Sequence, residues 1–109
     1  MIRLSVKLRN GGRQIETLSA SGHAGMMRES GDPVCAAVTV LIRTLVLFLK
    51  TRPEFESDIR IPERGHVFLS VGTVPAESGD CWESICEFFL LGLRSIENDY
   101  PEAFNLRYL

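Results

Sequence analysis

The sequence SGHAGMMRESGDPVCAAVTV, residues 21–40, places a histidine and a cysteine near the two ends of a glycine-bearing segment. Asp32 and Pro33 predict a helix start, because aspartate caps free backbone N–H groups and proline suits the first helical position. Cys35 then falls in the first helical turn, where the positive end of the helix dipole favours a thiolate over a thiol. The intervening loop is long enough to bring the imidazole of His23 to the sulfur. A cysteine–histidine dyad is therefore possible, and the alternative is a buried cysteine with an ordinary turn histidine.

The sequence of this segment resembles that of the ribosomal-processing cysteine protease family of small bacterial proteins. The family's histidine motif is matched by Gly22, His23, Ala24 and Gly25. Its cysteine motif is matched by Gly31, Asp32, Val34, Cys35, Ala36, Ala37 and Val38. Two positions depart from the pattern, since Pro33 replaces the usual isoleucine and Thr39 replaces a serine one helical turn after the cysteine. Outside this segment the likeness is one of overall layout.

The resemblance implies that His23 is the general base and Cys35 the nucleophile of a cysteine endopeptidase. Its substrate would be large-subunit ribosomal protein number twenty-seven, from which it would remove an N-terminal extension. We expect backbone N–H groups near the helix start to hold the oxyanion. Asp32 is either a third, orienting residue or a plain helix cap. The alternatives are a non-enzymatic, ribosome-associated or protein-interaction module and, more weakly, a thiol redox protein.

The segment between the two motifs has glycine at both ends and two methionines in its middle. We expect it to form a substrate loop that closes over bound peptide, against the alternative of an ordinary surface loop. The resemblance points the same way, because substrates of the family present a pair of phenylalanines before the scissile bond. The residues assigned to this substrate loop are Gly22, Ala24, Gly25, Met26, Met27 and Gly31.

Length and composition predict one domain over residues 1–109. The 12 basic and 14 acidic residues form no basic run, so direct binding of nucleic acid is disfavoured. An odd number of cysteines and no signal peptide indicate the reducing cytoplasm and no disulfide framework. Cys81 and Cys86 do not have the spacing of a metal or redox pair, and we expect them to be core or half-buried thiols, with no metal and no cofactor.

Residues 33–50 predict a helix that is apolar nearly all round. Its apolar run, residues 34–49, is shorter than the roughly 20 residues of a membrane span and contains Arg43, so we interpret it as a buried helix. Such a helix must be covered on most sides. Either a second helix and loops or a second copy of the chain can do this, and we expect a homodimer, as the family resemblance also implies.

The other elements follow from alternation and turn signals. Residues 1–9 and 14–20 predict strands joined by a turn at 10–12, and 59–61 and 66–71 predict a second hairpin after a polar link at 50–57. Residues 81–99 predict a helix capped by Asp80 with Glu83, and a last strand follows. The apolar stripe expected on that helix is Ile85, Phe88, Phe89, Leu93 and Ile96.

The predicted order β-β-α-β-β-α-β indicates an α+β fold with two helices packed on a largely antiparallel sheet. The strand order within that sheet does not follow from the pattern. His66 begins a strand directly after a turn, and we interpret it as a surface residue, against the alternative of a ligand or base.

Overall fold

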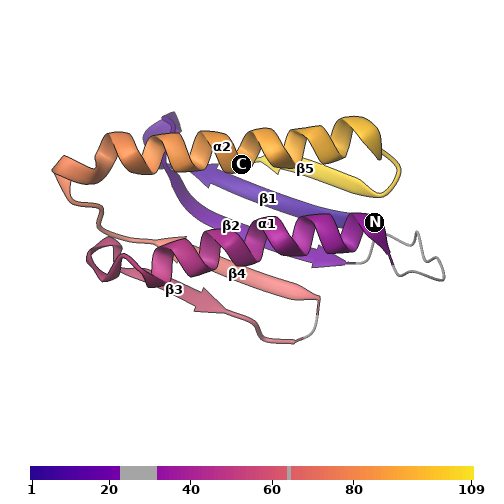
Figure 1. The fold of residues 1–109 in the computed structure, drawn as a ribbon, viewed down its shortest axis with the longest axis horizontal. Helices are drawn as coiled ribbons and strands as arrows, with labels where there is room; N and C mark the ends of the chain where they lie inside the picture. Colours follow the sequence, from indigo (N-terminus) through magenta and orange to yellow (C-terminus); the bar gives the residue numbers. More distant parts are fainter. Residues whose placement is uncertain (23–31, 64) are drawn as a thin grey trace.

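The computed structural model describes residues 1–22, 32–63 and 65–109. In this part of the chain two helices lie side by side over one face of a five-stranded sheet (Figure 1). The elements are β1 (Ile2–Leu8), β2 (Ile15–Gly22), α1 (Pro33–Lys50), β3 (Ser57–Arg60), β4 (His66–Val71), α2 (Gly79–Asp99) and β5 (Phe104–Tyr108). The α+β class and the order β-β-α-β-β-α-β are confirmed.

The strands are arranged in the order β3-β4-β2-β1-β5. Three of the four pairings are antiparallel, as predicted, and β5 runs parallel to β1 with Ile2 opposite Phe104 and Val6 opposite Tyr108. The turn between β1 and β2 is built on left-handed backbone at Asn10 (φ 53°) and Gly11 (φ 66°), which asparagine and glycine tolerate best. This topology brings the start of β1, the end of β2 and the start of β4 to one end of the sheet.

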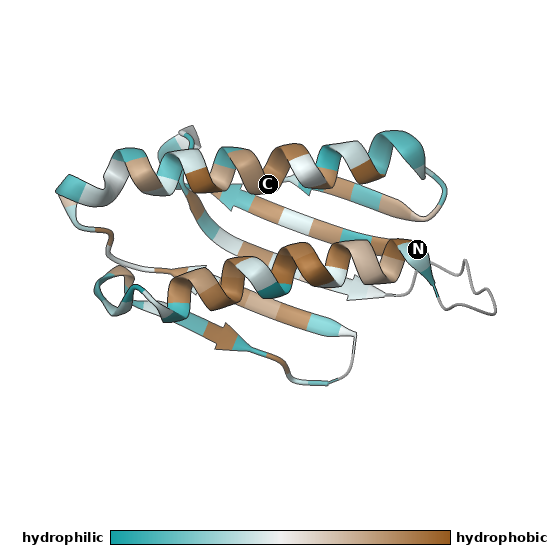
Figure 2. Cartoon of the chain, in the orientation of Figure 1, coloured by the Kyte–Doolittle hydropathy of each residue, from teal (hydrophilic) through white to brown (hydrophobic). Residues whose placement is uncertain are grey.

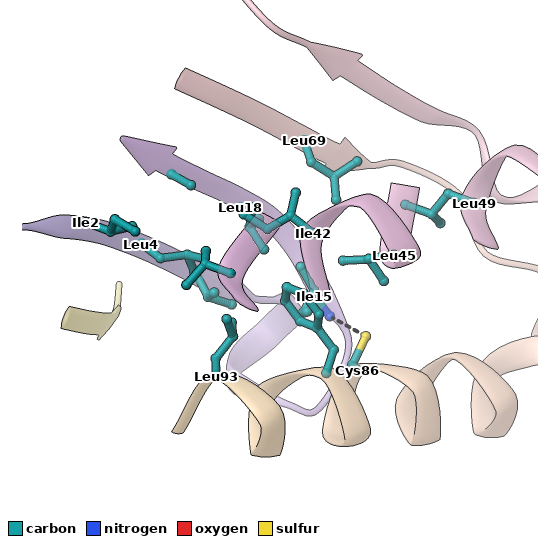
Figure 3. Packing of buried hydrophobic residues seen from close by; sticks show 14 of the residues in the cluster. Ile2, Leu4, Ile15, Leu18, Ile42, Leu45, Leu49, Leu69, Cys86 and Leu93 are labelled. Carbon is teal, nitrogen blue, oxygen red and sulfur yellow. Dashed lines mark hydrogen bonds between the residues drawn. The ribbon is translucent and has the colours of Figure 1, made fainter. Parts of the chain in front are cut away.

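The core lies between the sheet and the two helices. Figure 3 shows Leu4, Leu18 and Leu69 of the strands pointing toward Leu45 of α1 and Leu93 of α2. Alternate residues of β1 are buried, because successive side chains of a strand point to opposite faces.

Helix α1 has the bounds that the sequence predicts, and one of its faces packs on the sheet. That face consists of Val34, Val38, Ile42, Leu45 and Leu49. By length and composition alone α1 could cross a membrane, but here it forms one wall of the core. Its other face is not covered within a single chain, since Val40 and Leu47 are 56% and 55% exposed.

Helix α2 differs from its prediction at its start and in its buried face. A short 3-10 turn, Ala76–Ser78, runs directly into the helix, so that Ser78 is the N-cap and Asp80 lies inside the first turn. The predicted capping box of Asp80 and Glu83 is therefore wrong. The buried face consists of Trp82, Cys86, Phe89 and Leu93, while Phe88, predicted on the stripe, is 77% exposed.

Two further predictions need correction. The link at residues 50–57 is not merely polar, because its 3-10 turn Pro53–Phe55 buries Phe55 against the rings of Phe48 and Trp82. Cys86 is buried as expected, but Cys81 is exposed, since it lies on the solvent side of α2.

Candidate active site

Cys35 occupies the third position of α1. Pro33 is the first helical residue, and Asp32 precedes it with an extended backbone (φ −95°, ψ 108°). This is the geometry of a helix N-cap, whose side-chain oxygen satisfies N–H groups that have no partner inside the helix. The Asp32 carboxylate accepts from Val34 N at 3.0 Å and from Cys35 N at 3.1 Å. Local sequence thus fixes the cysteine in the first helical turn.

The cap also engages the backbone donors that we expected to hold an oxyanion. Val34 and Cys35 donate to the Asp32 side chain, and Ala36 N donates to the Asp32 carbonyl oxygen at 3.0 Å. Pro33 has no N–H. In this arrangement residues 33–36 offer no uncommitted N–H group, because the carboxylate cap uses the donors that an oxyanion would need. Residue 31 lies outside the described residues, so the oxyanion site near the helix start stays a prediction.

Asp32→Ala is expected to lower the free energy of unfolding by about 0.5–2 kcal/mol, through loss of the two cap hydrogen bonds. Asp32→Asn is the matched control, since its amide oxygen can still accept from both N–H groups. Chemical denaturation of both variants gives the stability difference. Turnover within tenfold of wild type fits a cap alone; a loss of several decades in the alanine variant at unchanged fold would contradict that role and make Asp32 an orienting residue.

A cavity of about 480 Å³ adjoins Cys35 where α1 passes over one end of the sheet. The helix contributes Cys35, Val38, Thr39, Ile42 and Arg43. The sheet contributes Ile2, Ala20, Ser21, Gly22, Gly65 and Val67. The walls of the cavity are therefore mostly apolar side chains or backbone, and Cys35 lies on α1, the helix that borders the cavity. Such a cavity can hold part of a peptide beside a nucleophile.

Gly22, the first glycine of the histidine motif, borders the cavity on the side of the sheet. Its backbone geometry explains why this position is a glycine. It ends β2 opposite Ile2, and its N–H donates to the carbonyl oxygen of Gly65 at 3.2 Å. Its φ is +99°, and a Cβ there would clash with the carbonyl oxygen of Met1. Only glycine fits both conditions, so the chain leaves β2 at the edge of the cavity immediately before residue 23.

His23 and four of the residues assigned to the substrate loop, Ala24, Gly25, Met26 and Met27, lie outside the described residues, as does Gly31. The structure brings together the two described flanks of that segment, because Gly22 and Cys35 border one cavity. The dyad and the closing loop therefore stay predictions.

His66, the second histidine of the chain, is a half-buried residue at the start of β4. Its Nδ1 lies 3.3 Å from Oε1 of Glu63, and its backbone pairs with Ser21 of β2. The neighbouring Gly65 and Val67 border the cavity, but the side chain of His66 does not line it. No group of three or more His, Cys, Asp or Glu residues in the described ranges could hold a metal ion.

Burial separates the three thiols. Desolvation by burial raises the pKa of Cys86 from 9.0 to about 12, against the lowering effect of the Ile15 N–H, and the charge of Glu83 raises it further. The Ile15 N–H donates to Cys86 Sγ at 3.4 Å (Figure 3). Cys86 is therefore a neutral core thiol at physiological pH.

Iodoacetamide at pH 7 is expected to alkylate Cys35 fastest and Cys86 not at all in the folded protein, as read by peptide mass spectrometry. Cys81 is the internal reference for an exposed thiol. Faster labelling of Cys81 than of Cys35 would contradict the choice of nucleophile.

The raised pKa of Cys86 also predicts how stability depends on pH. Its stabilising contribution is complete below about pH 9 and is lost as the pH rises toward 12. Cys86→Ala should therefore reduce the fall in the free energy of unfolding at alkaline pH.

Sequence reasoning missed most of the cavity. Thr39 and Arg43 follow Cys35 at intervals of four residues, a spacing that places side chains along one side of a helix, so this signal was available. Ile2, Ala20 and Val67 come from three strands whose order the sequence did not predict.

The family model described as cysteine protease Prp matches residues 1–105. The crystal structure of an essential ribosomal processing protease Prp from Staphylococcus aureus, with a covalently linked product peptide, has a TM-score of 0.83 at 23% identity and full coverage of both chains. The same protein with a substrate peptide gives 0.79 at 22% identity, again with both chains fully covered.

SMU.848 from Streptococcus mutans also has a TM-score of 0.79, at 25% identity, with 100% of this chain and 94% of the other covered. A comparison with curated proteins finds no match. The solved structures share the arrangement of two helices on a five-stranded sheet, and the family model extends over nearly the whole chain.

Proposed function

Because the chain belongs to the Prp family of cysteine proteases, we propose that it removes the N-terminal extension of large-subunit ribosomal protein number twenty-seven during ribosome assembly. The observation that carries this proposal is the cavity bordered both by Cys35, in the first turn of α1, and by Gly22, the residue before His23. The S. aureus relative, described as a ribosomal processing protease that binds a substrate peptide, supports the choice of substrate. We place the activity in the cytoplasm, where thiols stay reduced.

In the proposed reaction, His23 withdraws the proton of the Cys35 thiol and the sulfur attacks the carbonyl carbon of the scissile bond. The C–N bond breaks as the imidazolium returns the proton to the leaving amine, and water then hydrolyses the thioester. The Asp32 carboxylate, bonded to Cys35 N, offsets part of the positive helix end. Activation of the thiol therefore depends mainly on His23.

The apolar walls of the cavity fit the substrate that the family resemblance implies. Val38, Ile42 and Val67 lie beside Cys35 with no acidic side chain among the described lining residues. Burial of aromatic side chains in such a space stabilises a bound peptide in proportion to the apolar area removed from water. A pair of phenylalanines before the scissile bond would use these walls.

The test is cleavage of the organism's own ribosomal protein, expressed with its N-terminal extension. Intact mass spectrometry should show one new N-terminus with the wild-type protein and none with Cys35→Ala. If the ribosomal protein carries no such extension, or stays intact in this experiment, the proposed substrate is wrong.

We also propose that two copies of the chain associate through the outer faces of α1 and α2. Figure 2 shows α1 mostly hydrophobic on the side turned away from the strands, with hydrophilic residues near its middle. The exposed apolar residues of this helical face are Val40, Leu47, Phe88 and Leu91. A hollow of about 190 Å³ lies between the helices beside Phe88. An apolar face of this kind can pair with its own copy about a two-fold axis.

Leu47→Glu is expected to convert a dimer into a monomer, because it places a charge on that apolar face. Size-exclusion chromatography with light scattering measures the change in mass. Leu109→Glu, which alters an exposed leucine away from the helical face, is the control and should stay dimeric. A wild-type protein that is monomeric at micromolar concentration would contradict the proposal.

A further inference from the structure

We propose that the face of the sheet turned away from the helices binds single-stranded RNA. This site lies apart from the cavity of Cys35, and it does not depend on which peptide the protease cleaves. Association of two copies through their helices would leave this face free on both copies. Together with the proposed function, such a site would hold the protease on the RNA of the particle in which its substrate is assembled.

The proposed site is the outer sheet face, which we define as the strand residues that alternate with those of the core. Both helices cover the other face of the sheet (Figure 1). On β1, for example, Ile2, Leu4 and Val6 are buried, and the residues between them point away from the helices. None of the outer residues of the five strands belongs to the buried core. The outer sheet face is therefore open to solvent in the described part of the chain.

The outer sheet face is basic, although the whole chain has 12 basic and 14 acidic residues. Arg60 is paired with Asp58 at 2.9 Å, and Lys7 lies 3.6 Å from Glu16, which sits beside the irregular end of the β1–β2 pairing. These four charges balance one another. The exposed basic residues of the face that take part in no ion pair among the described residues are Arg3 and Arg107.

This charge is separated from the charge of the rest of the chain. Of the 12 basic and 14 acidic residues, four and two lie on or beside the outer sheet face, which leaves eight and twelve elsewhere. The four cations come from β1, β3 and β5, so they form no basic run in the sequence, and strand pairing is what brings them to one face. A positive surface on an acidic protein favours a polyanionic partner at that surface.

Strand pairing also aligns five side chains in a row across the middle of this face. Arg60 of β3 lies opposite Phe68 of β4, which lies opposite Ser19 of β2. Ser19 lies opposite Ser5 of β1, and Ser5 lies opposite Arg107 of β5. Neighbouring strands are about 4.8 Å apart, so the two arginines are about 19 Å apart, with an aromatic ring and two hydroxyl groups between them. A flexible polymer of phosphates can contact both ends of this row.

Phe68 is the feature that favours single-stranded RNA over other polyanions. Its side chain is 39% exposed, and its neighbour on β2 is the small Ser19, so a flat group can lie against the ring. Unpaired bases stack on exposed aromatic rings of this kind, while basic side chains contact the phosphates. Serine hydroxyls can exchange hydrogen bonds with the ribose 2′-OH, which DNA lacks. An acidic protein would use the cations of this face but not the ring.

Fluorescence anisotropy with a labelled oligouridine of about 12 nucleotides tests the charges, since single-stranded sites span about 4–16 nucleotides. We expect Arg3→Glu/Arg107→Glu to weaken binding at least about tenfold. It should also reduce the slope of log K against log salt by about 1.4, or about 0.7 for each lost phosphate contact. Lys50→Glu/Arg94→Glu is the matched control, because it makes the same change in net charge at exposed residues of α1 and α2, and it should bind RNA within about twofold of wild type.

Phe68→Leu tests the ring, because leucine keeps an apolar side chain on β4 but offers no aromatic face. We expect it to weaken RNA binding by about fivefold or more, the lower end of what one stacked base contributes. Wild type should bind the single-stranded RNA more tightly than DNA of the same sequence and more tightly than duplex RNA, whose bases are hidden in the stack. Circular dichroism should show every variant to be folded.

Equal RNA affinity in wild type and Arg3→Glu/Arg107→Glu would overturn the proposal, as would a wild-type protein that binds no RNA at about 50 mM salt. DNA, duplex RNA or polyglutamate that binds as tightly as the single-stranded RNA, or an unchanged affinity in Phe68→Leu, would reject single-stranded RNA as the partner. Cleavage of a free ribosomal peptide should match wild type in all these variants, since the altered residues lie outside the cavity of Cys35. Absence of that cleavage in wild type would reject the proposed substrate alone, so the two failures are distinguishable.

Discussion

Cys35→Ala is expected to abolish peptide-bond hydrolysis, and His23→Ala to lower kcat/KM by about 10⁴- to 10⁶-fold, as for other nucleophile–base pairs that act as a unit. The physical reason is that a neutral thiol attacks a peptide carbonyl far more slowly than a thiolate. Asp32 already satisfies Cys35 N, so the helix start alone cannot replace the base. Cleavage of the ribosomal extension, followed by mass spectrometry, measures both losses.

His66→Ala is the matched control for the histidine. The ring of His66 contacts Glu63 and does not line the cavity of Cys35, so this variant should keep activity within about tenfold of wild type, well short of a catalytic loss. Circular dichroism and thermal melting should be unchanged in the Cys35 and His23 variants. A greater loss of activity in His66→Ala than in His23→Ala would mean that His23 is not the general base.

Trp82→Ala is expected to lower the free energy of unfolding by about 3–5 kcal/mol, the range for removing a fully buried aromatic ring. Trp82 has no exposed surface. Its ring lies parallel to that of Phe48 at a centroid distance of 6.3 Å and edge-on to Phe55 at 5.6 Å. Because small domains have only about 5–15 kcal/mol of stability, this loss should be visible in urea denaturation as a large fall in the midpoint.

Trp82→Phe separates ring packing from hydrogen bonding. Trp82 Nε1 is buried and has no hydrogen-bond partner among the described residues, so its loss removes no such bond and the phenylalanine variant should be far less destabilised than the alanine variant. Ile61→Ala, at an exposed residue beyond β3, should leave the midpoint nearly unchanged. Equal destabilisation by Trp82→Phe and Trp82→Ala would mean that the cluster with Phe48 and Phe55 contributes little.

The predicted and observed elements agree best where the residues that specify an element lie close together in the sequence. Helix α1 begins at Pro33 and ends at Lys50 as predicted, because Asp32 and Pro33 act within one turn of the residues they position. Strand β4 likewise matches residues 66–71. Helix α2 was harder, since its start is a 3-10 turn with no side-chain cap, and several apolar residues around its circumference permit more than one buried face.

The sequence by itself determined that Cys35 lies in the first turn of a helix and that the part of the chain which the structure describes makes two α-helices and five strands, because capping and alternation depend on neighbours a few residues apart. Only the tertiary structure decided what faces that cysteine. The cavity exists because the start of β1, the end of β2 and the start of β4 lie together beneath α1, with Gly22 at the edge of the cavity and Arg43 two turns from Cys35. Strand pairing joins residues far apart in the chain, and no local pattern specifies which strands become neighbours.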